Sequence, residues 1–190
     1  MSDAPAVQRV YSGESVRFTH GDGYRMTVED AHRRITEALT LAQEIPRPRW
    51  DFSLLVADDV VGVIALRVRE PGMGTVSYIL RQDAWGQGHA TEAVRRVAAF
   101  AFTHTDLECL EAKHHPANPA SGRVLAKAGF TCVGTSDLHA EGGVVVPYPA
   151  YELRRYGPSH RPSRLRQQAG QRPPPHRLPQ DQTRTDRHCG

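Results

Sequence analysis

The chain has 190 residues with 24 basic and 21 acidic side chains, a net charge of +3, which suits one domain with a hydrophobic core. No apolar run is long enough to span a membrane, and the N-terminus lacks the basic-then-apolar pattern of a signal peptide, so we expect a cytoplasmic protein without a membrane partner. The three cysteines lie far apart without metal-ligand spacing, and we expect Cys109 and Cys132 to be buried small apolar side chains.

The charge is uneven along the chain. Residues 157–190 contain seven arginines, six prolines and two aspartates, with no aromatic, Val, Ile or Met side chain. Such a segment buries too little apolar surface to offset the entropy of ordering, so we predict one domain over 1–156 and a disordered tail over 157–190. The tail could contact RNA or lipid headgroups, but no aromatic residues lie between its arginines. This composition favours a solvated extension and makes nucleic acid an unfavoured partner.

The N-terminal half predicts a helix followed by three strands. Before residue 27 the pattern is weak, and residues 7–18 fit either a short helix or a strand. Thr27 to Asp30 fits a capping box, and a helix follows until Ile45-Pro46, because a residue before proline is pushed out of the helical region. Its expected apolar face comprises Ala31, Ile35, Ala38, Ala42 and Ile45. Residues 51–57, 60–69 and 75–80 are β-rich runs separated by turns, which predicts an antiparallel meander with Tyr78 in the core.

A strand, a turn with two glycines and an amphipathic helix over 89–104 follow each other directly. The free N–H groups and the dipole of a helix N-terminus favour an anion, and Gly86 and Gly88 let the backbone approach it closely, so we predict a phosphate site. Thr91 stands where a dinucleotide fingerprint needs a third glycine, and the lack of Gly-Lys-Ser/Thr excludes a P-loop. The next strand, 107–113, should lie parallel to 75–80 because a helix connects them.

The last elements are a short helix and a closing strand pair. Asn118 is a preferred N-cap and Pro119 a preferred first helical residue, and Gly129 ends this helix. Residues 130–138 and 144–155 read as an antiparallel pair. His114 and His115 are neighbours on a strand and point to opposite faces, with no third ligand spaced for them, so we predict no metal site.

The order of these elements and two motifs resemble the GNAT acetyltransferase superfamily, above all its branch of ribosomal-protein N-terminal acetyltransferases. The first motif is Trp85-Gly86-Gln87-Gly88-His89-Ala90-Thr91-Glu92-Ala93. The second is Asn118-Pro119-Ala120-Ser121 together with residues 124–130, and the resemblance covers residues 27–155. It implies an α/β (α+β) fold, a mixed and mostly antiparallel sheet flanked by helices. It also implies an enzyme that transfers acetyl from acetyl-CoA directly to a primary amine, a small molecule or a peptide N-terminus.

The resemblance also implies roles for individual residues. Strands 75–80 and 107–113 would splay, and the exposed backbone of Ile79, Leu80 and Arg81 would pair with the pantetheine arm of the donor. The residues expected at the pyrophosphate are Gly86, Gln87, Gly88, His89, Ala90 and Thr91. Asn118 would help to hold the donor, and Ser121 would protonate the departing thiolate.

The sequence departs from this family in the residues that would supply a base. Strand 75–80 contains no carboxylate, and Glu111, His139 and Glu141 remain open as alternatives. An α-amine titrates near ~8 and a lysine near ~10.4, so a site with a weak base suits an acceptor of low pKa. In addition, Asp83 places an acid where many relatives have Gln or Arg, close to the expected phosphate.

The N-terminal segment departs as well. Relatives usually have a strand and a helix before the helix that begins here at Thr27. Without that first strand, the edge of strand 51–57 would be exposed, which favours pairing with a partner such as a second copy in a homodimer, and part of the acceptor site would be missing. Two other functions therefore remain open: a degenerate domain of this family that binds CoA or a partner without turnover, and a nucleic-acid-associated module that acts through the basic tail.

Overall fold

The computed structural model describes residues 3–19, 24–139 and 145–155. The helical elements are α1 (Ala4–Val10), η1 (Gly13–Val16), α2 (Val28–Leu41), η2 (Gln82–Ala84), α3 (His89–His104) and α4 (Pro119–Lys127). The strands are β1 (Arg49–Val56), β2 (Asp59–Glu70), β3 (Met73–Leu80), β4 (Cys109–Lys113), β5 (Thr131–His139) and β6 (Val145–Arg154). The tail predicted over 157–190 lies outside the described residues.

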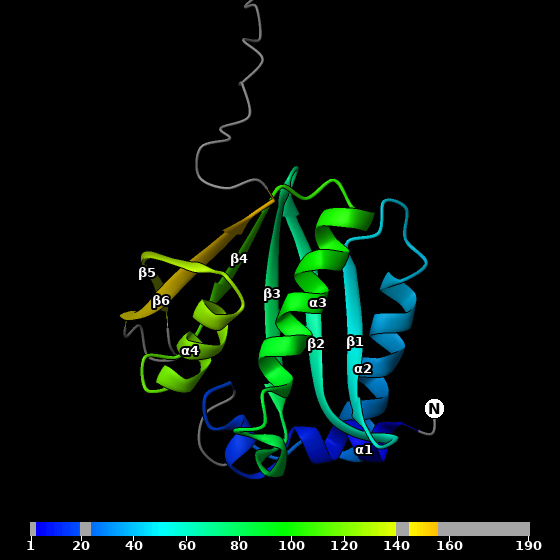
Figure 1. Cartoon of the computed structure of the whole chain (residues 1–190). Helices are drawn as coiled ribbons and strands as arrows, with labels where there is room; N and C mark the ends of the chain where they lie inside the picture. Colours follow the sequence, from blue (N-terminus) through cyan, green and yellow to red (C-terminus); the bar gives the residue numbers. More distant parts are fainter. Residues whose placement is uncertain (1–2, 20–23, 140–144, 156–190) are drawn as a thin grey trace, which may run out of the picture. The chain divides into compact units, whose positions relative to one another are not determined.

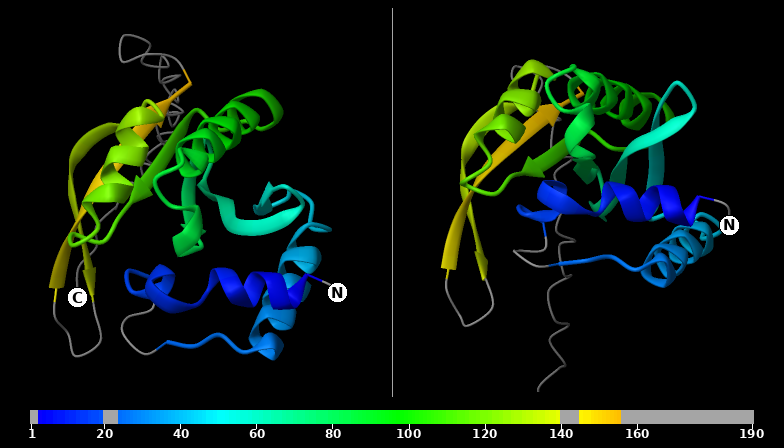
Figure 2. Two further views of the ribbon diagram at one scale, coloured as in Figure 1. Left: turned by 60° about the horizontal axis from the view of Figure 1, so that its bottom comes forward. Right: turned by 90° about the horizontal axis from the view of Figure 1, so that it is seen from below.

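Six strands form one sheet in the order β1-β2-β3-β4-β6-β5 (Figure 1). Every neighbouring pair is antiparallel except β3 and β4, which are parallel and joined through α3. The predicted meander, helical crossover and closing strand pair are therefore confirmed. Helices α3 and α4 cover one face of the sheet, and α1 and α2 lie on the other (Figure 2).

Each face of the sheet has its own hydrophobic cluster. On the α3 side, Leu66 and Leu110 from the strands are fully buried against Val94 of α3 and Leu125 of α4. On the other side, Val10 of α1, Ala31 of α2 and Ile79 of β3 belong to a second cluster. Because burial of apolar surface is the main favourable term in folding, these two clusters fix the helices on the sheet. They thereby fix the residues at the ends of those helices.

Helix α2 begins as predicted and ends earlier. The backbone N–H of Asp30 donates to Thr27 Oγ1 at 3.0 Å, and Asp30 Oδ2 accepts from the Thr27 N–H at 3.0 Å, which confirms the capping box. The helix ends at Leu41 through tighter turns, with Glu44 N donating to Leu41 O at 3.3 Å. Ile45 is consequently 98% exposed, and its predicted place on the apolar face was wrong.

The structure also decides the N-terminal segment, which the sequence left open, and corrects the prediction for one cysteine. Residues 7–18, for which a helix and a strand were both open, contribute to α1 and η1, and β1 is an edge of the described sheet. Cys109 is buried as expected, whereas Cys132 is exposed. The prediction failed for Cys132 because β5 is the other edge strand, and its residues 131–135 are exposed. Pairing of two copies along an open edge stays a prediction.

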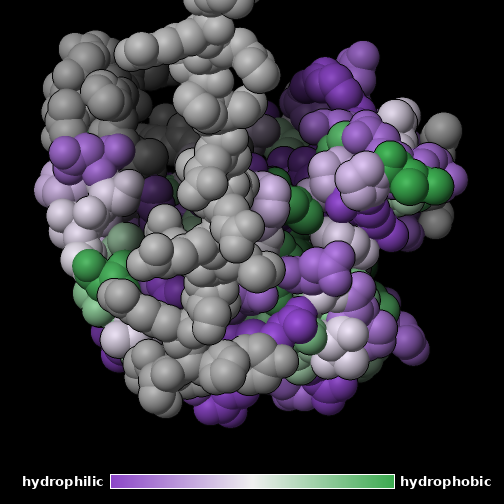
Figure 3. Space-filling model, turned by 90° about the horizontal axis from the view of Figure 1, so that it is seen from above, coloured by the Kyte–Doolittle hydropathy of each residue, from purple (hydrophilic) through white to green (hydrophobic). Residues whose placement is uncertain are grey.

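The described surface has few large hydrophobic side chains. None of the described helices is long and apolar enough to cross a membrane. On the face seen in Figure 3, hydrophobic residues appear as small separate spots among hydrophilic ones. The large apolar side chains that are exposed come from several elements: Val28, Leu39, Ile45, Leu55, Val56, Val68, Trp85 and Val133.

Candidate functional site

Strands β3 and β4 separate in the middle of the sheet. They pair only at Met73↔Cys109, Gly74↔Leu110 and Thr75↔Glu111, after which β4 continues along β6. In Figure 1 the two strands lie close together at the top and diverge downward, toward α4 and the start of α3. The predicted splay is thus present, and the second half of β3 has no strand partner on its β4 side.

The hydrogen-bond pattern tells which backbone groups of β3 face this opening. The N–H of Arg81 donates to Val61 O of β2 at 2.8 Å. Backbone groups alternate between the two sides of an antiparallel strand, so Ile79 also faces β2, whereas Leu80 and Tyr78 face β4. The indole Nε1 of Trp85 donates to Leu80 O at 2.9 Å. The set expected to pair with a ligand therefore changes. The backbone groups of Ile79 and Arg81 face β2, so their prediction was wrong, whereas Leu80 keeps its N–H on the open side and Tyr78 joins it there.

The N-terminus of α3 is open to solvent and has no side-chain cap. Its N-cap residue Gly88 has φ 86°, and Gly86 just before it has φ 76°, conformations that a side chain disfavours. A Cβ at either glycine would meet nothing within 4 Å, so neither glycine is packed against another part of the described chain. In contrast, α2 and α4 are capped by Thr27 and Asn118. The first-turn N–H groups of α3 consequently favour an anion from outside the chain.

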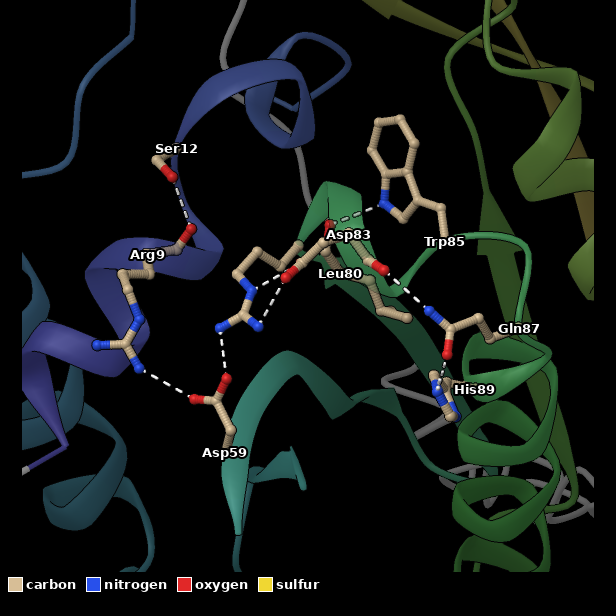
Figure 4. A network of polar contacts seen from close by, with 9 residues as sticks. Arg9, Ser12, Asp59, Leu80, Asp83, Trp85, Gln87 and His89 are labelled. Atoms are coloured by element: carbon tan, nitrogen blue, oxygen red, sulfur yellow. Dashed lines mark hydrogen bonds and ion pairs between the residues drawn. The ribbon is translucent and has the colours of Figure 1, made fainter. Parts of the chain in front are cut away.

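A network of charged groups supports the loop that leads into α3 (Figure 4). Arg81 binds Asp83 through two hydrogen bonds of 2.7 and 2.8 Å, and it contacts Asp59 at 2.8 Å. Asp59 in turn contacts Arg9 of α1 at 3.0 Å. The Arg81 guanidinium holds the pKa of the Asp59 and Asp83 carboxyls below their usual range. It thereby offsets the negative charge of Asp83, the acid close to the expected phosphate. Gln87 Nε2 completes the network by donating to Asp83 O at 2.8 Å.

On the far side of the opening, α4 presents Ser121. The Asn118 side chain accepts from the Ser121 N–H at 3.2 Å, which confirms the predicted N-cap. The Ser121 hydroxyl lies 2.7 Å from the hydroxyl of Tyr78, which also donates to Ser121 O at 3.1 Å. Burial raises the pKa of Tyr78 to about 12. Sequence reasoning placed Tyr78 in the core and missed this contact, because it joins residues 43 positions apart.

Helix α4 packs closely on two polar side chains. A Cβ at Gly122 would lie 2.7 Å from His114 Nε2 and 2.8 Å from the Tyr151 hydroxyl. Only glycine therefore allows this approach without movement. His114 Nδ1 lies 2.8 Å from His115 O, and the ring is 8% exposed. Within the described part of the chain, no three His, Cys, Asp or Glu side chains are grouped to hold a metal ion.

These elements enclose a pocket of about 510 Å³. Its walls come from β3, the glycine loop, the first turn of α3, α4 and the region of η1. Of the residues predicted at the donor, the following line it: Ile79, Leu80, Gly86, Gly88, His89, Ala90, Thr91 and Asn118. Arg81 and Gln87 do not line it and instead belong to the network described above. Among the described lining residues there is no carboxylate, and Arg123 and Lys127 of α4 supply positive charge.

The candidates for a base lie elsewhere. Of the residues predicted to be catalytic, the proton donor Ser121 lines the pocket, whereas the possible base Glu111 does not. Glu111 is adjacent to Leu110, whose side chain packs toward α3, so Glu111 points to the opposite face. Glu141 and the side chain of His139 lie outside the described residues. Arg123 and Lys127 were missed by sequence reasoning, although their spacing of four residues on a helix places them on one face.

Comparison with known proteins assigns the chain to a family. The family model of the acetyltransferase (GNAT) domain matches residues 1–131. The chain belongs to the GNAT acetyltransferase family.

Individual relatives agree with this. The chain is 34% identical over 83 residues to the uncharacterized N-acetyltransferase p20 of Bacillus licheniformis, covering 42% of this chain and 47% of p20. It is 34% identical over 122 residues to the probable N-acetyltransferase YjcK of Bacillus subtilis, covering 62% of this chain and 66% of YjcK. The match thus spans about half to two thirds of these relatives.

A solved structure shows the same fold. The ribosomal L7/L12 α-N-protein acetyltransferase RimL, in complex with coenzyme A, superimposes with a TM-score of 0.70 at 18% identity. The superposition covers 80% of this chain and 89% of RimL.

Proposed function

We propose that the pocket binds acetyl-CoA and that the protein transfers the acetyl group to a primary amine. One observation carries this proposal: the uncapped N-terminus of α3, the opening between β3 and β4 and the Ser121 hydroxyl all line a single pocket. Membership of the GNAT family and the coenzyme A bound by RimL support the identity of the donor.

The residues present fit such a donor. The first-turn N–H groups at His89, Ala90 and Thr91 suit its pyrophosphate, because they are free and lie at the positive end of the helix dipole. Arg123 and Lys127 suit a further phosphate, since the described wall contains no carboxylate that would repel it. The backbone of Tyr78 along the open edge of β3 suits the amide groups of an extended arm.

Acetyl-CoA supplies a thioester, and the chain must help a thiolate to leave. As the amine forms the new C–N bond, the C–S bond breaks and the sulfur requires a proton. We assign the donation of this proton to Ser121, whose hydroxyl lies at the pocket wall. Tyr78 is a positioning residue: its phenol, with a pKa of about 12, stays neutral at physiological pH and keeps the Ser121 Oγ in place at 2.7 Å.

The acceptor must lose a proton as well. Because no carboxylate lies among the described lining residues, an amine that is already neutral near pH 7–8 is the better nucleophile. We therefore propose an α-amine, on a small molecule or at a peptide N-terminus, in preference to a lysine side chain. Glu111 and Glu141 remain candidates for the base, directly or through water.

Thiol release from acetyl-CoA over a panel of amines tests the proposal. We expect release with α-amines and a loss of about 10²-fold in kcat for Ser121→Ala, the usual contribution of one positioned acid. Ser53→Ala on β1 is the matched control, since it removes an exposed serine that does not line the pocket. If lysine side chains react faster than α-amines, the acceptor proposal is wrong. Binding of acetyl-CoA without thiol release from any amine would indicate a degenerate, non-catalytic member of the family.

A further inference from the structure

Several arginines gather on the face of the sheet opposite to α3. Leu66 and Val76 pack toward α3, so the residues next to them on their strands, Arg67 and Ser77, point to the other face. Arg67 Nη1 donates to the Ser77 hydroxyl at 2.6 Å. Arg34 of α2 approaches from the helix layer on this face, where its guanidinium carbon lies 4.7 Å from the ring centre of Tyr11.

The positive charges in this cluster are not all matched. Arg49 forms ion pairs with Asp51, at 2.7 Å, and with Glu37, at 3.6 Å. Within the described residues, neither Arg67 nor Arg34 forms an ion pair with a carboxylate. Yet the Arg67 side chain is half-buried.

The surroundings of Arg67 penalise its charge. Burial is the main cause that lowers the pKa of Arg67, and the charge of Arg49 lowers it further; the nearby carboxylate of Asp51 raises it, which offsets part of this effect, and the charge of Arg34 again lowers it. A half-buried cation among like charges is stabilised when an anion binds beside it, because the anion replaces the lost hydration and offsets the repulsion. The cluster therefore has the electrostatics of an anion-binding site.

Its position relates it to the donor pocket. Ser77 is exposed and lies on the part of β3 beyond the last rung with β4, which is Thr75↔Glu111. Ile79, two residues further and on the same face, lines the pocket. Two residues of a strand span about 7 Å. An anion held at Arg67 would thus lie within the length of a small substrate from the opening where the acetyl group is transferred.

We propose that Arg67 and Arg34 bind a carboxylate of the acceptor, so that the substrate is an amine that also carries a negative charge, such as an amino acid or a short peptide with a free C-terminus. The identification as an acceptor rests on the proposed function.

Equilibrium binding tests this inference without requiring turnover. The probes are N-acetyl-alanyl-alanine and its C-terminal amide, titrated into the full chain with and without saturating coenzyme A. We expect the acid to bind at least tenfold more tightly than the amide, and we expect added salt to reduce the difference. Arg67→Gln should bring the two affinities together. Arg69→Gln removes an exposed charge from the same strand and should preserve the preference.

Equal affinity for acid and amide would overturn the inference, and so would equal weakening of both probes by Arg67→Gln. If Arg67→Gln does not fold, the salt dependence of the wild-type preference decides. Thiol release with alanine, alanyl-alanine and their amides then distinguishes a free amino acid from a peptide as the source of the carboxylate. Failure of acetyl-CoA to bind is a separate result, which would refute the proposed function while leaving the acid-over-amide preference measurable.

Discussion

Substitution of Gly122 by alanine tests how closely α4 must pack. The new Cβ would lie 2.7 Å from His114 Nε2 and 2.8 Å from the Tyr151 hydroxyl, so one or both must move. The rings of His114 and Tyr151 contact each other with centroids 5.6 Å apart, and His114 is buried, so neither retreats freely. Overpacking costs about 1–3 kcal/mol, and alanine regains about 1 kcal/mol of helix propensity. We expect a net loss of roughly 1 kcal/mol, or about 2–4 °C in Tm for a chain of this size.

The same movement should impair catalysis, because Gly122 is next to Ser121. Thermal unfolding and thiol release are the assays. Ala126→Gly, an exposed change on the same helix, is the control: it should cost about 1 kcal/mol through propensity alone and leave activity intact. Tyr151→Phe in the Gly122→Ala background removes one of the two close atoms and should restore part of both losses, which a double-mutant cycle measures. A Gly122→Ala protein as stable and as active as the wild type would refute the reasoning.

Two further predictions concern the groups around the pocket. The pKa of Tyr78 is raised above its unfolded value of 10.0 to about 12, so its contribution to stability is complete below pH 10 and is lost as pH rises through 12. Chemical unfolding at pH 9 and pH 11 should therefore show an alkaline loss, about 1.4 kcal/mol for one pKa unit, that Tyr78→Phe reduces; an equal loss in both proteins would contradict it. Arg81→Gln leaves Asp59 and Asp83 negative beside the N-terminus of α3, and we expect acetyl-CoA affinity to fall several-fold. Arg154→Gln breaks a pair with Glu152 on β6, and neither residue lines the pocket, so this variant should leave that affinity unchanged; an equal effect of both variants would argue against the network.

Local rules predicted most of the fold. Helix α3 has the predicted bounds, α4 begins after Asn118, and β4 is parallel to β3, because caps, glycines and helical crossovers are set by neighbouring residues. The same rules failed where neighbours along the chain were not decisive. Ile45 keeps the helical period but lies beyond turns that end α2 early, and Cys132 lies on an edge strand whose exposure depends on the order of the strands.

The candidate site shows the same division. The glycine loop and the helix N-terminus are continuous in sequence and were predicted together. The contact of Tyr78 with Ser121, in contrast, depends on how α4 docks beside the opening of the sheet, and the pairing of Arg81 with Asp59 depends on the β1–β2 turn. Alternation along β3 places Tyr78 on the α3 face, but only the packed structure brings α4 within hydrogen-bond distance.

The central claim is that the open N-terminus of α3 holds the phosphates of acetyl-CoA, and Gly88→Ala tests it most directly. Gly88 and Gly72 have φ 86° and 78°, and a Cβ at either meets nothing within 4 Å, so both alanine variants should lose a similar amount of stability, about 1–2 kcal/mol. Of the two, only Gly88 lines the pocket assigned to acetyl-CoA. In calorimetric titrations we expect wild type and Gly72→Ala to bind one acetyl-CoA with equal affinity, and Gly88→Ala to bind at least tenfold more weakly. Equal affinity in all three proteins, or no binding to the wild type beyond that of inorganic phosphate, would contradict the account.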